Sequence, residues 1–419
     1  AHRRTLLWCL ILLFGTGLRI FYVLATPYDV RGHDANGHVE YIRYVLAHWS
    51  LPPPHGGLEF YHPPLYYVLS ALVVRGGEIL GFQDSLFLMQ LIALFFSVAT
   101  LVVALWVLEQ SLSETQRHSH FAMLGLALAA FPSLVFFASR VNNDVLSGFL
   151  SFLTLGLLLW WWKKPDWWRF LPLTISVALG ILTKSSALLW IPIVLLCVML
   201  KGKFSMRAKL LASGFFILFL ILTTTGYTLP RMSREKDTRE LLVGNVSILT
   251  NFVSNEPRYY VTFNPYQILR HPFNDPFNDA ERRSYVWEYF FRSAFFGEFN
   301  FGDALRPIAQ AILLFALFLI PLAISGIVID VLSREALRWP LWICLAANLA
   351  GFFLYRIVYP YSSSQDFRYT IVLLIPALVA LVPASRTPRW MRYAANILLA
   401  LLLAGMTLFL LTVSSIIDL

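Results

Sequence analysis

The chain has 419 residues, of which 58% are hydrophobic and 14% are charged. Soluble globular domains average about 45–50% apolar and about 25% charged residues, so this composition excludes an ordinary soluble protein. The formal net charge of +9 does not indicate nucleic-acid binding, because the Lys and Arg residues cluster in short loops between long apolar segments. The composition therefore indicates a multi-pass integral membrane protein.

Apolar segments long enough to cross a bilayer as helices recur along the whole chain. About eleven such helices are expected, near residues 5–25, 86–108, 119–138, 144–162, 168–183, 185–200, 208–228, 307–330, 339–358, 368–384 and 393–415. The first follows "HRR" without a clear cleavage site, so we expect a membrane helix there and not a signal peptide. Cys9, Cys197 and Cys344 lie in apolar segments, which indicates neither a disulfide framework nor a thiolate metal site.

The segment 62–82 decides on which side of the membrane every later loop lies. Arg75 and Glu78 interrupt it before it reaches the roughly 20 apolar residues that a span needs. If it does not span and the N-terminus is cytoplasmic, basic loops such as "KKPDWWR" and "KGKFSMRAK" all fall on the cytoplasmic side, as the positive-inside rule requires. We therefore expect a first outer loop at 26–85 that contains two juxtamembrane helices.

One of these juxtamembrane helices is predicted over "ANGHVEYIRYVLAHW". Its apolar residues recur at helical spacing and would form an apolar underside: Val39, Ile42, Val45, Leu46 and Trp49. The second is predicted to begin at "HPPL" within 62–82. The expected fold class is thus an all-α polytopic membrane protein.

A second outer region, 229–305, is long, polar and rich in Arg, Asn, Tyr and Phe. We expect it to cover the outer site, between a transmembrane module at 1–228 and C-terminal transmembrane helices at 306–419. The tripeptide "NVS" at 245–247 is a single glycosylation sequon, which does not distinguish an endoplasmic reticulum membrane from a bacterial one. The compact chain favours a bacterial plasma membrane, with the N-terminus in the cytoplasm.

Ionisable residues from distant parts of the chain all fall at the outer ends of the predicted helices. Such groups are costly at a membrane boundary, and they usually serve a function. They are His33, Asp34, His38, Glu40, His62, Arg140, Asp144, Lys184, Asp366 and Arg368, with Asn143 and Tyr369 beside them. We expect them to line one cleft at the outer mouth of the helix bundle.

Most of these residues also have a purely structural interpretation. Asp34 and Asp144 each precede or begin a helix, where Asp is a favoured cap, but a carboxylate at the bilayer surface is also suited to act as a general base. His62 precedes a Pro-Pro helix start, where backbone donors can face a phosphate. Lys184 and Arg368 can extend to the lipid headgroups or bind a phosphate.

The order of these motifs resembles the GT-C superfamily of membrane glycosyltransferases. The motifs are an acidic first outer loop, "HPPL", "RVNND", "GILTK" and "FRYTIVLLIPAL", and the resemblance extends over about residues 5–385. It is strongest to the branch that includes protein O-mannosyltransferases and the lipid A aminoarabinose transferase. The mannosyltransferases have adjacent Asp and Glu in the first loop, whereas Ala35 follows Asp34 here, so the acceptor is left open.

The resemblance implies a polyprenyl-phosphate-linked sugar donor and transfer on the non-cytoplasmic face. It assigns Asp34 as the essential first-loop aspartate, and His62, Lys184, Arg368 and Tyr369 as residues near the donor phosphate. Asp144 matches the acidic residue of the second outer turn. Arg140 is a further candidate phosphate ligand from the residues themselves.

The function expected from the sequence is an inverting glycosyl transfer to an acceptor hydroxyl, with Asp34 as general base and cations stabilising the departing phosphate. The acceptor would be a lipid, a glycan or a protein. No metal or other cofactor is required by this scheme, although His33, Asp34 and His38 could bind a divalent ion without a clear ligand spacing. The alternatives are a lipid or ion transporter and a non-catalytic lipid-binding subunit with the same fold.

Overall fold

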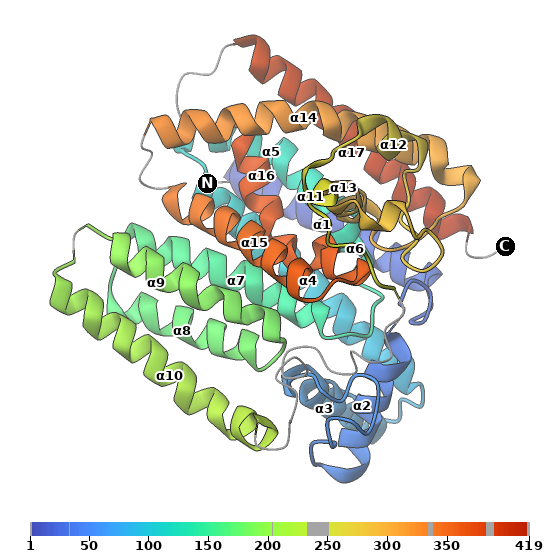
Figure 1. Ribbon diagram of the computed structural model, residues 1–419, viewed down its shortest axis with the longest axis vertical. Coiled ribbons are helices and arrows are strands. Elements are labelled where there is room, and N and C mark those ends of the chain that lie inside the picture. Colours follow the sequence, from blue (N-terminus) through green and yellow to red (C-terminus); the bar gives the residue numbers. More distant parts are fainter. Residues whose placement is uncertain are drawn as a thin grey trace. The chain divides into compact units, whose positions relative to one another are not determined.

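The computed structural model describes residues 2–32, 34–202, 204–232, 251–333, 338–382 and 389–416. Within these ranges the chain is helical, apart from loops and an isolated antiparallel bridge between Phe252 and Tyr361. The α-helices are α1 (His2–Ala25), α2 (Ala35–His48), α3 (Leu65–Ile79), α4 (Ser85–Ser111), α5 (Glu114–Ala129), α6 (Pro132–Phe136), α7 (Asp144–Lys163), α8 (Trp167–Ile181), α9 (Trp190–Leu200), α10 (Met206–Met232), α11 (Pro257–Val261), α12 (Pro265–Arg270), α13 (Val286–Phe296), α14 (Arg306–Leu332), α15 (Trp339–Val358), α16 (Leu374–Ala380) and α17 (Arg389–Ile416) (Figure 1). Short 3₁₀ helices are η1 (Ser185–Leu189), η4 (Arg282–Ser284), η5 (Asp303–Leu305), η7 (Ser362–Gln365) and η8 (Phe367–Leu373).

Seven helices in the described ranges are long and apolar enough to cross a membrane, namely α1, α4, α7, α10, α14, α15 and α17. They correspond to seven of the eleven predicted spans, and the all-α polytopic fold class is confirmed. The segments 168–183 and 185–200 form shorter apolar helices, α8 and η1 with α9. The 15 residues of α8 rise only about 22 Å, which is less than the roughly 30 Å thickness of a bilayer core.

The two remaining predicted spans are broken. Residues 119–138 divide into α5 and α6, because Phe131 is extended in front of Pro132, as a residue before proline prefers. Residues 368–384 begin as the 3₁₀ helix η8, which contains the non-helical Thr370, and continue as α16. All residues of α6 are buried, so the irregular backbone is enclosed by protein.

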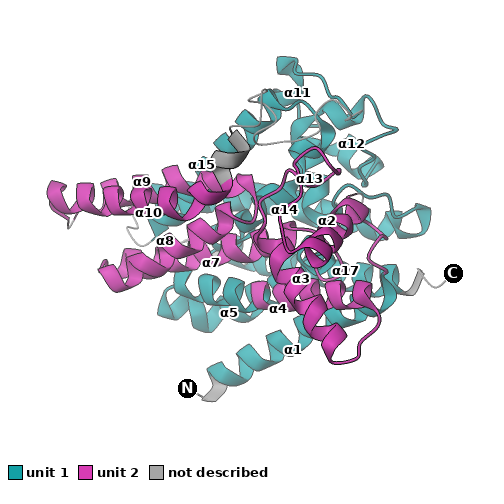
Figure 2. Ribbon diagram, turned by 90° about the horizontal axis from the view of Figure 1, so that it is seen from below, with its two compact units in different colours: residues 1–26, 101–137, 250–419 teal, residues 27–100, 138–249 magenta. Residues whose placement is uncertain are grey.

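Contacts divide the chain into two compact units (Figure 2). Unit 1 comprises residues 1–26, 101–137 and 250–419, and unit 2 comprises residues 27–100 and 138–249. In unit 1, α14 packs against α17, and α1 packs against α5, α6 and α17. The backbones of α14 and α16 meet directly, because a Cβ atom on Gly326 would overlap the carbonyl oxygen of Ala380.

Of the second outer region predicted at 229–305, residues 229–232 form the end of α10 in unit 2, and residues 251–305 belong to unit 1. Arg356 attaches the segment 251–305 to the end of α15. This arginine is fully buried. Its guanidinium donates to Asn255 Oδ1 (2.6 Å), to the Ser254 carbonyl (2.9 Å) and to Gln365 Oε1 (3.1 Å). A buried cation needs such partners, so the segment is fixed to α15 by polar contacts.

In unit 2, α2 packs against α3, α7 packs against α8, and α10 packs against α8 and α9. A continuous apolar core joins α2 and α3 to the first turns of α4 and α7. Within it, the rings of Tyr41 and Tyr67 stack with centroids 3.7 Å apart, which fixes α2 and α3 against each other.

The helix predicted over "ANGHVEYIRYVLAHW" is confirmed as α2, with Val39, Ile42 and Val45 buried. Leu46 is partly buried, but Trp49 is exposed and ends the helix in the left-handed conformation, with φ 49°. Trp49 therefore does not extend the apolar face as expected. The segment 62–82 forms the 15-residue α3, too short to be a span.

Candidate functional site

Asp34 stands at the N-cap of α2, and its carboxylate makes no capping hydrogen bond to the helix. The side chain is half-buried. The structural interpretation of Asp34 as a helix cap is thus not realised, and its carboxylate remains suited to chemistry. His33, predicted beside it, lies outside the described residues.

His38 lies on the buried face of α2 and is only 3% exposed. Its Nδ1 atom is 2.8 Å from the hydroxyl of Tyr67 on α3, and the two rings stack. Burial lowers the pKa of His38 to about 4, so the imidazole is neutral at pH 7. Glu40, two residues later, is exposed, and the structure does not place it with His38.

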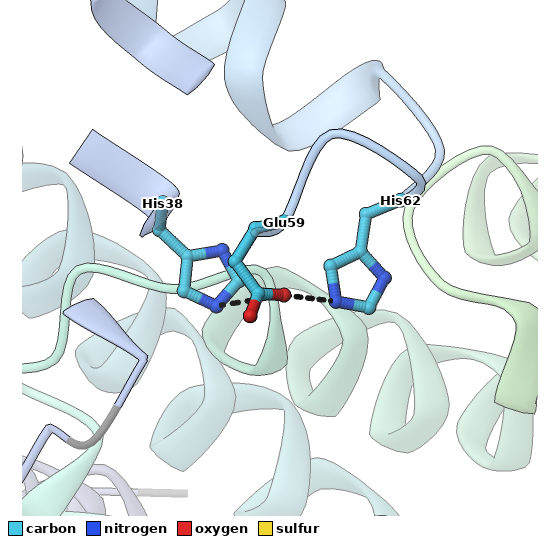
Figure 3. A group of neighbouring side chains, drawn as sticks. All are labelled: His38, Glu59 and His62. Carbon is cyan, nitrogen blue, oxygen red and sulfur yellow. Dashed lines mark ion pairs between the residues drawn. The ribbon is translucent and has the colours of Figure 1, made fainter. Parts of the chain in front are cut away.

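Glu59 lies between His38 and His62 (Figure 3). Its Oε2 atom is 2.9 Å from Nε2 of His62 and 4.0 Å from Nε2 of His38. All three side chains are buried, and each offers one potential metal-ligand atom, these atoms lying within 4.8 Å of one another. Gly37 lets α2 approach this loop, because a Cβ there would lie 2.7 Å from Glu59 Cγ.

Sequence reasoning missed Glu59, although a signal was present. Glu59 is the single acidic residue between Glu40 and Glu78, and it precedes His62 by three positions. The His62 side chain, predicted to face a donor phosphate, contacts this carboxylate instead. Its role toward phosphate stays a prediction.

The turns "RVNND" and "GILTK" meet in unit 2, as two buried contacts show. Asp144 is the first residue of α7, and its carboxylate accepts a hydrogen bond from the Lys184 ammonium. Asn143 donates from Nδ2 to the Thr183 carbonyl at 3.2 Å. The N-cap of α7 is Asn143 and not Asp144, and the Asp144 carboxylate pairs with Lys184.

His38 connects the first loop with this ion pair electrostatically. After burial, the charges that act on the pKa of His38 are those of Glu59 and Asp34, which raise it, and of His62 and Lys184, which lower it. We call these residues the loop cluster: Asp34, His38, Glu59, His62, Asp144 and Lys184. Arg140, also predicted, is buried in the same unit, in the turn before α7.

The other predicted residues form a second group in unit 1, which we call the Arg368 cluster: Tyr289, Glu298, Asp366, Arg368 and Tyr369. Asp366 caps η8 by accepting from the Arg368 backbone N–H at 3.0 Å. The Arg368 guanidinium lies 3.5 Å from carboxylate oxygens of both Glu298 and Asp366.

Aromatic residues complete this cluster. The Tyr289 hydroxyl donates to Glu298 at 2.6 Å, and Arg368 donates to the Tyr369 hydroxyl at 3.3 Å. Glu298 was not predicted from the sequence. The expectation that all the outer polar residues line a single cleft stays a prediction.

The sequence matches the family model described as "Predicted membrane protein (DUF2142)" over residues 54–272, slightly more than half of the chain. The chain belongs to this family. No curated protein matches it. The matched range contains Glu59, His62, the Asp144–Lys184 pair and the helices α3 to α10.

Solved structures show which fold this member of the family has. ArnT from Cupriavidus metallidurans, in the apo state and bound to undecaprenyl phosphate, superposes with a TM-score of 0.57 at 14% identity, covering 97% of this chain and 76% of ArnT. The apo oligosaccharyltransferase of Archaeoglobus fulgidus gives a TM-score of 0.54 at 13% identity, with 97% of this chain covered. The chain spans 55% of the length of that oligosaccharyltransferase.

These two enzymes are GT-C glycosyltransferases, so the GT-C fold predicted from the order of motifs is confirmed. The family and the seven candidate spans also confirm an integral membrane protein. The side on which the N-terminus lies and the bacterial origin stay predictions.

Proposed function

We propose that the protein is a GT-C-type glycosyltransferase that moves a sugar from a polyprenyl phosphate to an acceptor hydroxyl on the non-cytoplasmic face. The observation that carries this proposal is the carboxylate of Asp34, half-buried at the start of α2 and not used as a helix cap. The GT-C fold supports it, because it is a fold on which lipid-linked sugars are transferred. The N-terminus would then lie in the cytoplasm, following the positive-inside rule.

Asp34 is the proposed general base. It accepts the proton of the acceptor hydroxyl as the oxygen attacks the anomeric carbon of the donor. The bond between that carbon and the phosphate oxygen breaks on the opposite face of the sugar, so the configuration is inverted. The lipid phosphate leaves with the bonding electrons, and negative charge grows on its oxygens.

Lys184 is the proposed cation for this leaving group, since a fixed positive charge stabilises a transition state in which phosphate charge develops. An ammonium carries three N–H donors, so contact with Asp144 is compatible with contact to a phosphate. Arg140 and His62 are further candidates within unit 2. Arg368 and Tyr369 lie in unit 1, and their role near the donor phosphate stays a prediction.

The carrier lipid is proposed from the lipids bound in the similar structures. ArnT was solved with undecaprenyl phosphate, and the archaeal oligosaccharyltransferase AglB with dolichol phosphate and an inhibitory peptide. Both lipids are polyprenyl phosphates, which supports this class of donor here. The acceptor is not carried over, because this chain spans 55% of AglB.

The decisive experiment compares Asp34→Asn with Glu40→Gln, an exposed acidic residue on the same helix. Purified wild-type protein in liposomes is supplied with a panel of polyprenyl-phosphate sugars and with lipid, glycan and protein acceptors, and release of polyprenyl phosphate is measured. We expect Asp34→Asn to lower the rate by about 10²–10⁴-fold, because general-base catalysis contributes that much, and Glu40→Gln to leave it unchanged. Mass spectrometry should detect equal amounts of co-purifying polyprenyl phosphate in all three proteins.

Two results would contradict the proposal. Wild-type turnover in Asp34→Asn would exclude Asp34 as the base. A wild-type protein that neither retains polyprenyl phosphate nor turns over any such donor would favour a transporter or a non-catalytic subunit.

A further inference from the structure

We infer that His38, Glu59 and His62 form a binding site for one divalent transition-metal ion, with Zn²⁺ as the ion that their ligand chemistry suits. The inference goes beyond the proposed glycosyl transfer, which requires no metal. It concerns the first outer loop alone, and it rests on the position of Glu59 between two buried imidazoles (Figure 3).

The geometry fits a compact metal site. Zn²⁺ binds histidine nitrogen and carboxylate oxygen at about 2.0–2.2 Å, so two ligand atoms at a tetrahedral angle are about 3.4 Å apart. The Glu59 oxygen is 2.9 Å from His62 Nε2 and 4.0 Å from His38 Nε2, and these separations bracket that value. All three ligand atoms lie within 4.8 Å of one another, so small side-chain rotations bring them onto one ion.

The donor set is also the right one. Two imidazoles and one carboxylate are a recognised zinc ligand set, one that leaves a fourth position for water or substrate. Carboxylate and carbonyl oxygens alone would suit Mg²⁺ or Ca²⁺, whereas imidazole nitrogen favours Zn²⁺ and related ions. The cluster therefore selects a transition metal over the hard cations.

Tyr67 contributes to the site by fixing the orientation of the His38 ring. Its hydroxyl lies 2.8 Å from Nδ1 of His38, and burial raises the pKa of Tyr67 well above its ordinary value, so the hydroxyl stays protonated. When Nδ1–H donates to this oxygen, the lone pair of Nε2 faces Glu59. Metal-bound histidines are held in this way by a hydrogen bond from their other ring nitrogen.

The site joins two parts of the first outer loop, which are already in contact through the hydrogen bond from the Tyr41 hydroxyl to the His62 carbonyl. His38 is on α2, whereas Glu59 and His62 belong to the irregular segment between α2 and α3. An ion bound by all three would fasten this segment to α2, one turn from Asp34. We assign the metal a positioning role for the loop next to the proposed base.

The test starts from full-length wild-type protein in detergent, stripped with a chelator and then titrated with Zn²⁺. We expect one ion per chain by inductively coupled plasma mass spectrometry and an upward shift of the unfolding temperature on Zn²⁺ addition. Glu59→Gln and His62→Gln should each lower Zn²⁺ affinity at least 100-fold and lose that shift. His48→Gln is the matched control, because His48 is the exposed histidine at the end of the same helix.

X-ray absorption on the zinc-loaded wild-type protein keeps the test independent of variant folding. It should show histidine ligands with Zn–N distances of about 2.0–2.1 Å. The inference is overturned if wild-type protein retains no zinc after loading. It is also overturned if Glu59→Gln and His62→Gln, folded by circular dichroism, bind as much zinc as the control.

Failure of this inference and failure of the proposed function give different results. Asp34→Asn should lose sugar transfer and still bind one zinc ion. Loss of sugar transfer when zinc is removed, with recovery on Zn²⁺ addition, would support the positioning role of the ion, and unchanged transfer without zinc would contradict it.

Discussion

Asp34 and Asp366 each stand at the N-cap of a helix, Asp34 before α2 in unit 2 and Asp366 before η8 in unit 1. The carboxylate of Asp366 accepts a hydrogen bond from the Arg368 backbone and is 2% exposed. The carboxylate of Asp34 makes no such bond and is half-buried. The same residue type at the same helical position thus makes a capping hydrogen bond in one unit and none in the other.

The cations of the two clusters, Lys184 and Arg368, also have different carboxylate partners. Lys184 contacts the carboxylate of Asp144, and Arg368 lies beside the carboxylates of both Glu298 and Asp366. A phosphate at Arg368 would have to approach two negative charges. The carboxylates beside a cation therefore affect how well it can serve as an anion ligand.

The largest expected effect concerns Arg368. Arg368→Met takes the guanidinium away from two buried carboxylates, and we expect a loss of at least about 3–5 kcal/mol in the free energy of unfolding. The control is Arg306→Met, which removes an exposed pair with Asp303 and should cost about 0–1 kcal/mol. Tryptophan fluorescence during denaturation in detergent measures both. Similar small losses would break the comparison and favour Arg368 as an available phosphate ligand.

A smaller effect compares the two caps directly. Asp366→Ala should lower the free energy of unfolding by about 1–3 kcal/mol, since it removes a cap and a charge-assisted hydrogen bond. Asp34→Ala should change it by less than about 0.5 kcal/mol, because no capping bond is lost. The same denaturation assay applies to both. Equal losses at the two positions would show that Asp34 is structural after all.

The smallest effect sharpens the comparison within the loop cluster. In Gly37→Ala the new Cβ would meet Glu59 Cγ, so Glu59 must move, and we expect Zn²⁺ affinity to fall about tenfold. Gly76→Ala on α3 is the control, because nothing lies within 4 Å of a Cβ there. Isothermal titration of both proteins with Zn²⁺ measures the difference. An unchanged Zn²⁺ affinity in Gly37→Ala would mean that Glu59 is not a ligand.

Much of the fold could be predicted, because it depends on local patterns. Apolar length gave the seven long helices, and the spacing of Val39, Ile42 and Val45 gave the buried face of α2. The breaks at Pro132 and Thr370 were not predicted, because an apolar segment has the same hydropathy whether its helix is continuous or broken. Hydropathy reports burial, and it does not report where surrounding protein permits an irregular turn.

The candidate site was predicted less completely. The pairing of Asp144 with Lys184 was anticipated only as a shared location, and Glu59 and Glu298 were not singled out. Both glutamates lie among aromatic residues, Glu59 before Phe60 and Glu298 before Phe299, in segments with no regular spacing. Packing between distant segments determines their partners, and such packing produces no repeating pattern in the sequence.

The sequence by itself determined that this is an all-α membrane protein with a GT-C order of motifs and with Asp34 at the start of a juxtamembrane helix. Those features follow from hydrophobic length, helical period and loop charge, which act over neighbouring residues. Only the tertiary structure decided that the Asp34 side chain makes no capping hydrogen bond, that the Asp366 side chain makes one, and that Glu59 lies between His38 and His62. Such contacts depend on how closely segments approach, as at Gly37 and in the Tyr41–Tyr67 stack, and close approach is a property of the packed molecule.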